Sequence, residues 1–185
     1  MNRILFSAEE WSAGEVLRLG GARARHVREV LRAEPGAVLK LGLLNGPRMR
    51  GRVLGWEGET VVLALEAGEV PPRPPVDVLL ALPRPKVLRR LLPQLVAMGV
   101  GRLYLTNAAR VERNYFDTHV LSEAALREAC VEGLTQAGDT LLPEIRVVRA
   151  LRPFVEDELG GLTAGMGRVL FHPQAAGEGW PPSQG

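Results

Sequence analysis

Short apolar runs separated by turn residues dominate the first 69 residues of the chain. Runs of this length, bounded by Gly, Pro and Asn and often alternating with polar residues, predict strands. The expected strands are Ile4–Phe6, Val16–Leu19, Val38–Leu44, Met49–Trp56 and Thr60–Leu65, with one helix, Ala22–Arg32, between the second and the third. Short strands at this close spacing favour a small β barrel or sandwich.

The pattern changes after residue 75, where apolar runs alternate with segments of helical period. Pro75–Tyr115 has the pattern of one βαβ unit, in which Gly99 ends the helix. The expected elements are a strand at Val76–Leu82, a basic turn at Pro83–Lys86, a helix at Val87–Met98 and a strand at Leu103–Thr106. A helix at Glu123–Ala137, capped by Ser122 and ended by Gly138, follows. A strand at Ile145–Val148, a helix at Pro153–Leu162 and a strand at Arg168–Phe171 come after it. This alternation predicts an α/β layer with a mostly parallel sheet.

A proline-rich stretch separates the two patterns. Val70–Pro75 reads VPPRPP, which favours an extended, semi-rigid spacer over a helix or a strand. We therefore expect a β-rich domain over residues 1–69, a linker over 70–75 and an α/β domain over 76–185.

Composition narrows the class further. With 46% hydrophobic and 24% charged residues, the 185-residue chain has ordinary globular composition, and no stretch approaches a membrane span. The N-terminal apolar run is too short for a signal peptide. Cys130 falls on the apolar face of an expected helix, which is typical of a buried thiol in a reducing compartment, so we expect a cytoplasmic protein. His26, His119 and His172 lack metal-ligand spacing, and we predict no metal site.

Charge is unevenly distributed despite a formal net charge of only +2. Residues 76–116 carry seven Lys or Arg and two acidic residues, whereas ten acidic and five basic residues follow from Asp117 onward. A positive middle and a negative end are compatible with a polyanion docking on one side, although a solvated helix face explains part of the asymmetry.

Two arginine patterns stand out in the first 69 residues. Val27, Val30 and Leu31 form the apolar side of the expected helix. Arg25, Arg28 and Arg32 share another side, which fits either an ordinary surface helix or an anion site. Three more arginines, at positions 48, 50 and 52, alternate along an expected strand and would project from one face. Like charges in a row repel, so an anion opposite them, such as phosphate, makes the arrangement easier to understand.

The turn after the first strand of the βαβ unit does not suit a dinucleotide. Pro83 and Pro85 have no N–H to offer to a phosphate, whereas the loops that cradle a cofactor are rich in glycine. Arg84 and Lys86 can still hold phosphate through their side chains, which suits an RNA backbone. A small-molecule α/β enzyme is correspondingly disfavoured.

Four motifs together resemble a known family. They are Arg25–Arg32 (RHVREVLR), Leu80–Lys86 (LALPRPK), Arg110–Tyr115 (RVERNY) and Gln136–Glu144 (QAGDTLLPE). In their order and spacing they resemble the RsmE family, the ribosomal RNA small subunit methyltransferases E of the SPOUT superfamily. The resemblance implies an α+β two-domain protein, with an N-terminal PUA-like β-barrel that binds RNA and a C-terminal α/β SPOUT-type domain with a deep trefoil knot. It also implies a homodimer that transfers a methyl group from S-adenosylmethionine to N3 of a uridine in 16S ribosomal RNA, a step of ribosome biogenesis.

The resemblance also implies where the site residues lie. We expect RNA binding by Arg25, His26, Arg28, Arg32, Arg50, Arg84 and Lys86. Family members continue into a Gly-Pro-Glu-Gly-Gly loop and a later knot segment, and this chain stops at Gly185 before either. Only the first edge of the cofactor pocket, Leu170, Phe171, His172 and Pro173, would then be present. The SPOUT domain is thus expected to be C-terminally truncated, the homodimer doubtful and the chain alone inactive. The alternative is a non-catalytic RNA-binding module or inactive fragment.

Overall fold

The structure, a computed structural model, describes residues 3–11, 14 and 16–171. It divides into two compact units, Met1–Ala150 and Leu151–Gly185, which are described separately below. None of the helices in the described ranges is long and apolar enough to cross a membrane.

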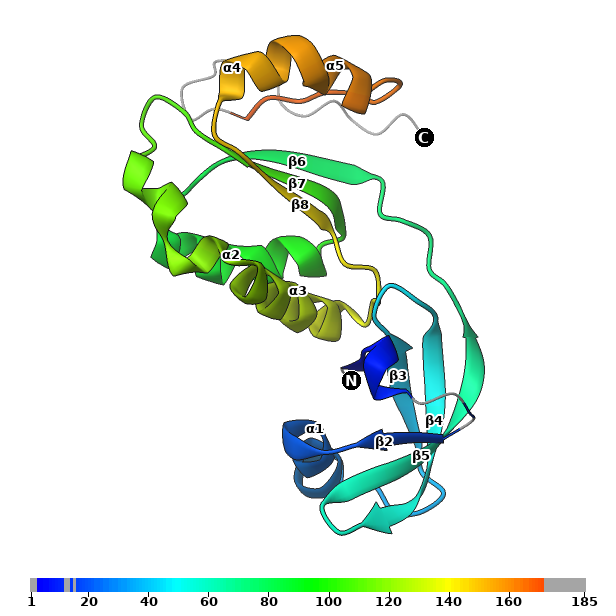
Figure 1. Cartoon of the computed structure of the whole chain (residues 1–185). Coiled ribbons are helices and arrows are strands. Elements are labelled where there is room, and N and C mark those ends of the chain that lie inside the picture. Colours follow the sequence, from blue (N-terminus) through cyan, green and yellow to red (C-terminus); the bar gives the residue numbers. More distant parts are fainter. Residues whose placement is uncertain (1–2, 12–13, 15, 172–185) are drawn as a thin grey trace. The chain divides into compact units, whose positions relative to one another are not determined.

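The first part of the chain forms a five-stranded sheet, called here the N-terminal sheet (Figure 1). Its strands are β1 (Ile4–Phe6), β2 (Val16–Leu19), β3 (Val38–Leu43), β4 (Arg48–Glu57) and β5 (Thr60–Glu69), in the order β1-β3-β4-β5-β2. β1 runs parallel to β3, and the other neighbours are antiparallel. All five predicted strands are confirmed, because period-two alternation and short turns sufficed to locate them.

The helix between β2 and β3 differs from the prediction. It comprises α1 (Gly21–Arg25) and a π-helical turn (His26–Val30), so it ends two residues before Arg32. A π-helical turn changes the angular spacing of successive side chains, and the predicted apolar face fails there. Val27 is fully buried, whereas Val30 is 66% exposed. Arg32 has a φ of 48° and lies off the helix, so it does not share a helix face with the other two arginines.

The α/β part contains a parallel three-stranded sheet in the order β6-β7-β8 (Figure 1). Its elements are β6 (Val76–Ala81), α2 (Pro85–Ala97), β7 (Val100–Thr106), 3-10 turns at Arg113–Asp117 and His119–Leu121, α3 (Glu123–Ala137) and β8 (Glu144–Val148). The predicted alternation up to β8 is confirmed. The helix caps are also as predicted: the Ser122 hydroxyl accepts a hydrogen bond from the Ala125 N–H, and Gly138 ends α3 with a φ of 71°.

Helices α2 and α3 pack against each other and share one core with the sheet. Leu88 and Leu92 of α2, Cys130 and Leu134 of α3 and Leu105 of β7 are buried in it. Burial raises the pKa of the Cys130 thiol to about 11, which keeps it protonated and unreactive at neutral pH.

Glycine allows the two helices to approach closely. A Cβ on Gly133 would lie 2.4 Å from the Pro93 carbonyl oxygen and 2.7 Å from the Val96 Cβ. Helix propensity favours alanine over glycine by about 1 kcal/mol, but the clash requires the helices to separate, which costs about 1 to 3 kcal/mol.

Gly133→Ala is therefore expected to destabilise the protein in urea unfolding. Gly160→Ala is the matched control, because Gly160 also lies in a helix and its Cβ would meet nothing within 4 Å. That control is expected to be neutral or stabilising. A Gly133→Ala variant as stable as the parent would show that the α2–α3 contact is looser than described.

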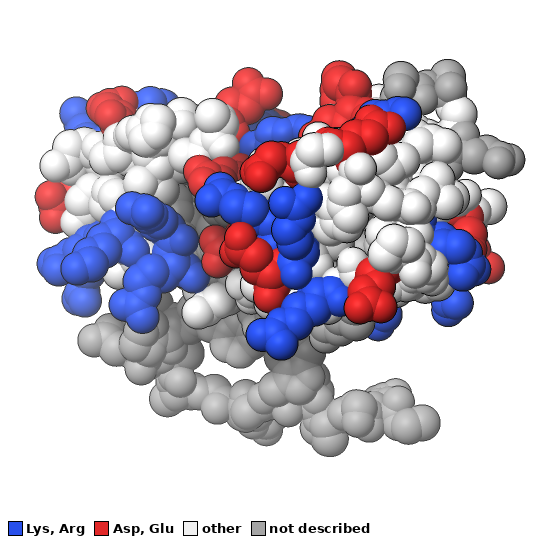
Figure 2. Space-filling view, turned by 90° about the horizontal axis from the view of Figure 1, so that it is seen from below, with Lys and Arg blue, Asp and Glu red and all other residues white. Residues whose placement is uncertain are grey.

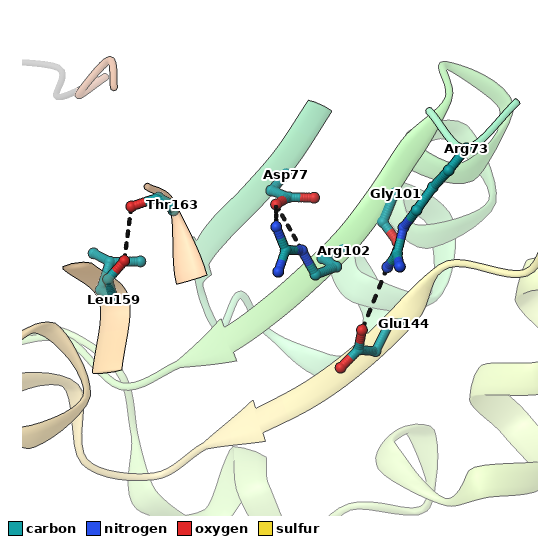
Figure 3. A network of polar contacts seen from close by, with 7 residues as sticks. All are labelled: Arg73, Asp77, Gly101, Arg102, Glu144, Leu159 and Thr163. Atoms are coloured by element: carbon teal, nitrogen blue, oxygen red, sulfur yellow. Dashed lines mark hydrogen bonds and ion pairs between the residues drawn. The ribbon is translucent and has the colours of Figure 1, made fainter. Parts of the chain in front are cut away.

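The sheet face opposite α2 and α3 carries a polar network (Figure 3). Arg102 of β7 donates to the Asp77 carboxylate of β6 through Nε at 2.7 Å and Nη2 at 2.6 Å. Arg73 donates to the Gly101 carbonyl oxygen and to Glu144, both at 3.3 Å. These contacts connect the proline-rich stretch and all three strands.

The second unit is described as far as Phe171. It forms one continuous helical stretch, α4 (Leu151–Pro153), a π-helical turn (Phe154–Glu158) and α5 (Leu159–Leu162), close to the predicted helix. The Thr163 hydroxyl donates to the Leu159 carbonyl oxygen at its end (Figure 3). The predicted strand Arg168–Phe171 is wrong: the segment is irregular, and among the described residues no strand pairs with it. An apolar run becomes a strand only when a neighbour supplies ladder hydrogen bonds.

Candidate RNA interface and carboxyl edge

The alternating arginines of β4 project from one face of the N-terminal sheet, as predicted. Arg48, Arg50 and Arg52 are exposed, and the residues between them are buried. The prediction that all three face an external anion needs correction, because the chain itself supplies two carboxylates. Arg48 pairs with Asp139 at 3.0 Å, and Arg52 pairs with Glu66 at 3.3 Å. Of the three, only Arg50 forms no ion pair with a described residue.

Lys40 is a second cation without an ion-pair partner among the described residues, and it lies beside Arg50. The two residues lie directly opposite each other on β3 and β4. Glu66 lies opposite Arg50 on the other side, but its carboxylate is held by Arg52. Neither the Lys40 nor the Arg50 side chain has an ion pair or a hydrogen-bond partner in the described ranges. Like charges directly opposite on adjacent strands are destabilising, so this pair suits a site for a phosphate. We call it the Lys40–Arg50 pair.

Cations near the helix complete the interface candidates. Arg25, His26 and Arg28 are exposed, but only Arg28 is held in place. Its guanidinium carbon lies 4.2 Å from the centroid of the Trp56 ring, and it donates to the Gly58 carbonyl oxygen at 2.8 Å. Its Nη1 also lies 3.7 Å from the exposed Glu59 carboxylate, so this stacked arginine presents a fixed planar donor set that is already partly paired. Seen from below, the molecule shows one group of Lys and Arg side chains at the left of the view, and elsewhere Lys and Arg interleaved with Asp and Glu (Figure 2).

The carboxyl ends of the three parallel strands form one edge of the sheet, where α/β proteins commonly bind ligands. Arg84 follows β6 and is the N-cap of α2, with Pro85 as the first helical residue and Lys86 as the second. The Lys86 side chain is exposed and makes no hydrogen bond or ion pair within the described segments. The proline-bearing turn is thus shorter than predicted, and the two cations lie at this edge.

Tyr115 lies close to Arg84 at the same edge. Its hydroxyl donates to the Glu112 carboxylate at 2.7 Å. This hydrogen bond raises the pKa of Tyr115, burial acts in the same direction, and Arg84 opposes both. Tyr115 therefore stays a neutral donor throughout the physiological pH range, and nothing here makes it a base.

Sequence reasoning missed a recess of about 550 Å³ at the ends of β7 and β8. Its lining residues are Asn107, Ala108, Val111, Arg113, Phe116, Asp117 and Arg149. The guanidinium carbon of Arg149 lies 5.3 Å from the Phe116 ring centroid, and its Nη2 pairs with Asp117 at 3.1 Å. The sequence did contain one indication of this recess. Asn107 and Arg149 directly follow two expected parallel strands, which places both at the carboxyl edge of the sheet.

The structure describes two of the four residues expected to hold the cofactor. Leu170 and Phe171 are 86% and 80% exposed, and His172 and Pro173 lie outside the described residues. The one carboxylate that lines the recess, Asp117, is paired with Arg149, so the described lining offers no free carboxylate to the sulfonium of S-adenosylmethionine. Among the described residues, no group of three His, Cys, Asp or Glu could hold a metal ion.

Comparison with known proteins defines the class. A family model described as an RNA methyltransferase domain matches residues 71–178, which is more than half of the chain. The chain thus contains an RNA methyltransferase domain. A ribosomal RNA small subunit methyltransferase E from Treponema pallidum is 31% identical over 157 residues, covering 83% of this chain and 59% of that protein. The chain belongs to the RsmE family and spans about three fifths of the length of this curated relative.

Solved structures share the fold. A probable rRNA methyltransferase from Porphyromonas gingivalis superposes with a TM-score of 0.63 at 19% identity, covering 82% of this chain and 63% of that one. A ribosomal RNA small subunit methyltransferase E from Neisseria gonorrhoeae, bound to S-adenosyl methionine, gives a TM-score of 0.59 at 19% identity, covering 80% and 62%. The mixed sheets and helices described above are thus an α+β arrangement of the RsmE type.

Proposed function

We propose that the chain is part of an enzyme that transfers a methyl group from S-adenosylmethionine to N3 of a uridine in 16S ribosomal RNA. Its membership of the RsmE family supports methyl transfer to rRNA. The observation that carries RNA binding is the Lys40–Arg50 pair, in which two cations face each other and neither forms an ion pair with a described carboxylate. The corresponding domain assignment is a PUA-like RNA-binding barrel over residues 1–69, a linker over 70–75 and a SPOUT domain from residue 76.

RNA would be held mainly through its phosphates. Arg25, Arg32, Arg50 and Lys86 are exposed and unpaired among the described residues, and Lys40 joins them. Arg28, His26 and Arg84 complete the proposed set. Contacts of this kind fix the position and orientation of the RNA and carry little sequence information. Choice of the uridine would then depend on RNA shape and on residues nearer the reacting base.

S-adenosylmethionine would supply a methyl group on a sulfonium, and its pocket would begin at Leu170–Pro173. The described residues do not enclose it, so the part of the reaction assigned to them is to hold rRNA. A non-catalytic RNA-binding module is the second candidate, favoured by the large exposed fractions of Leu170 and Phe171. We further propose a cytoplasmic location and, for the whole protein of which this chain would be part, the homodimer that the family resemblance implies.

Mapping of modified uridines tests the reaction itself. A methyl group at N3 blocks Watson–Crick pairing, so reverse transcriptase stops one nucleotide before it. Removing the gene from its host is expected to abolish one such stop in 16S rRNA, and restoring the gene should bring it back. An unchanged stop pattern in both ribosomal subunits would refute the proposed activity and leave the RNA-binding module.

A further inference from the structure

Strand β1 contributes to two hydrophobic cores at once. Ile4 and Phe6 are buried in the core of the N-terminal sheet, whereas Leu5 is buried in the core formed by α2, α3 and the parallel sheet. Successive side chains of a strand point to opposite faces, so a three-residue strand placed between two layers can serve both. The N-terminal sheet and the α/β layer are therefore packed together within the unit of residues 1–150.

The turn between β3 and β4 is hydrogen-bonded to the segment after α3. Asn45, with a φ of 58°, donates its backbone N–H to the Thr140 carbonyl oxygen at 2.8 Å and accepts from the Leu142 N–H through Oδ1 at 3.0 Å. The fully buried Thr140 hydroxyl donates to the Gly46 carbonyl oxygen at 2.6 Å. These three hydrogen bonds join the two layers much as a short strand pairing would.

Arg3 makes a second set of bonds across the same boundary. Its Nε donates to the Gly138 carbonyl oxygen at 2.9 Å, and its Nη1 donates to the Leu41 carbonyl oxygen at 2.6 Å and that of Met49 at 3.2 Å. Its backbone N–H donates to the Thr135 carbonyl oxygen at 3.3 Å. Burial lowers the pKa of Arg3, Arg48 acts in the same direction and Asp139 opposes them. One side chain thus connects the end of α3 to two strands.

Steric fit and charge complete this boundary. A Cβ on Gly42 would lie 2.5 Å from Thr140 Cγ2 and 2.7 Å from Arg3 Cδ, so the sheet surface accepts these side chains only because residue 42 is glycine. The Arg48–Asp139 ion pair, at 3.0 Å, lies at the same place, and the Asp139 side chain is only 19% exposed. Four residues of the QAGDTLLPE motif, Gly138, Asp139, Thr140 and Leu142, therefore make contacts at this boundary.

We propose that this boundary is a rigid junction that fixes the Lys40–Arg50 pair relative to the carboxyl edge of the parallel sheet, with Arg3, Asn45, Asp139 and Thr140 as its positioning residues. The proposal extends the proposed function, because an RNA held on the N-terminal sheet must present one base to the other layer at a fixed place. When a change far from the reacting atoms misplaces the substrate by about 1 Å, the reaction rate can fall about a hundredfold. The linker of residues 70–75 alone is a single attachment, and the junction supplies the second.

Distances between spin labels test the junction without any methylation assay, so this test can fail independently of the proposed function. Labels at Leu54→Cys on β4 and Met98→Cys after α2 occupy sites that are 51% and 74% exposed, and the buried Cys130 stays unlabelled. Pulsed electron–electron double resonance measures the distance between the two labels, and it should give one narrow distance distribution for the parent protein. Arg48→Glu and Thr140→Val should each broaden it at least twofold while circular dichroism stays unchanged.

Two matched variants make the result decisive. Arg18→Glu removes an ion pair with Glu57 that lies within the N-terminal sheet, and it should leave the distribution narrow. The exchange Arg48→Glu with Asp139→Arg restores the pair in reverse and should narrow the distribution again. A folded Thr140→Val or Arg48→Glu protein with the parent's width would overturn the proposal. If the single variants do not fold, a folded exchange variant with a broad distribution would overturn it equally.

Discussion

Lys40→Ala combined with Arg50→Ala is expected to weaken binding of a 16S rRNA fragment about tenfold near physiological salt. The two cations face each other across β3 and β4 and have no carboxylate partner among the described residues. Each phosphate contact releases condensed counterions, so losing two contacts should also reduce the slope of log affinity against log salt by about 1.5. Fluorescence anisotropy over a salt series measures both quantities. Stability should be unchanged or slightly higher, because a repulsive pair is removed.

A control must remove the same charge from cations that are already paired. Arg18 is paired with Glu57 at 3.0 Å, and Arg152 is paired with Glu156 at 2.8 Å. The double alanine variant of Arg18 and Arg152 changes net charge equally but should reduce affinity less than threefold. Equal losses in both double variants would show that RNA responds to total charge and that no phosphate site exists at the Lys40–Arg50 pair.

Gly68→Ala is expected to destabilise the protein by about 3 kcal/mol, although Gly68 is exposed. The register between β4 and β5 shifts there, since Arg48 pairs with Glu69 and Arg50 pairs with Glu66. A Cβ on Gly68 would lie only 1.7 Å from the Arg48 carbonyl oxygen and 3.1 Å from the Met49 Cα. Those atoms are backbone, so no rotamer change relieves the clash, and the bulge must rearrange.

Urea unfolding followed by circular dichroism measures this loss. Gly167→Ala is the control, because Gly167 lies in an irregular segment where a Cβ would meet nothing within 4 Å. That control should stay within about 0.5 kcal/mol of the parent. A Gly68→Ala variant within the same range would mean that β4 and β5 pair differently from the register given above.

Most of the fold followed from local pattern. Alternation, turn residues and the caps Ser122 and Gly138 located the strands and α3, because each depends on chemistry within a few residues. The π-helical turn that exposes Val30 did not follow, since the preference for it comes from packing. The strand expected at Arg168–Phe171 failed for a related reason, because a strand needs a neighbour that a local pattern does not supply.

The candidate site was only partly predictable. Alternation of Arg48, Arg50 and Arg52 placed three charges on one face, but which of them is free depends on Asp139 and Glu66, which are distant in sequence. Lys40 was missed because it stands alone among apolar residues, and only the β3–β4 register places it opposite Arg50. Residues that act together across strands become visible only once strand register is known.

Ultraviolet crosslinking of the chain to 16S rRNA, followed by mass spectrometry, tests most directly whether the N-terminal sheet is the rRNA interface. Crosslinked peptides are expected from β3 and β4 around Lys40 and Arg50 and from the helix that carries Arg25. Additional crosslinks near Arg84 would agree with the proposed carboxyl edge. Crosslinks confined to α2, α3 or the second unit, with none in residues 16–69, would contradict the proposal that the N-terminal sheet binds rRNA.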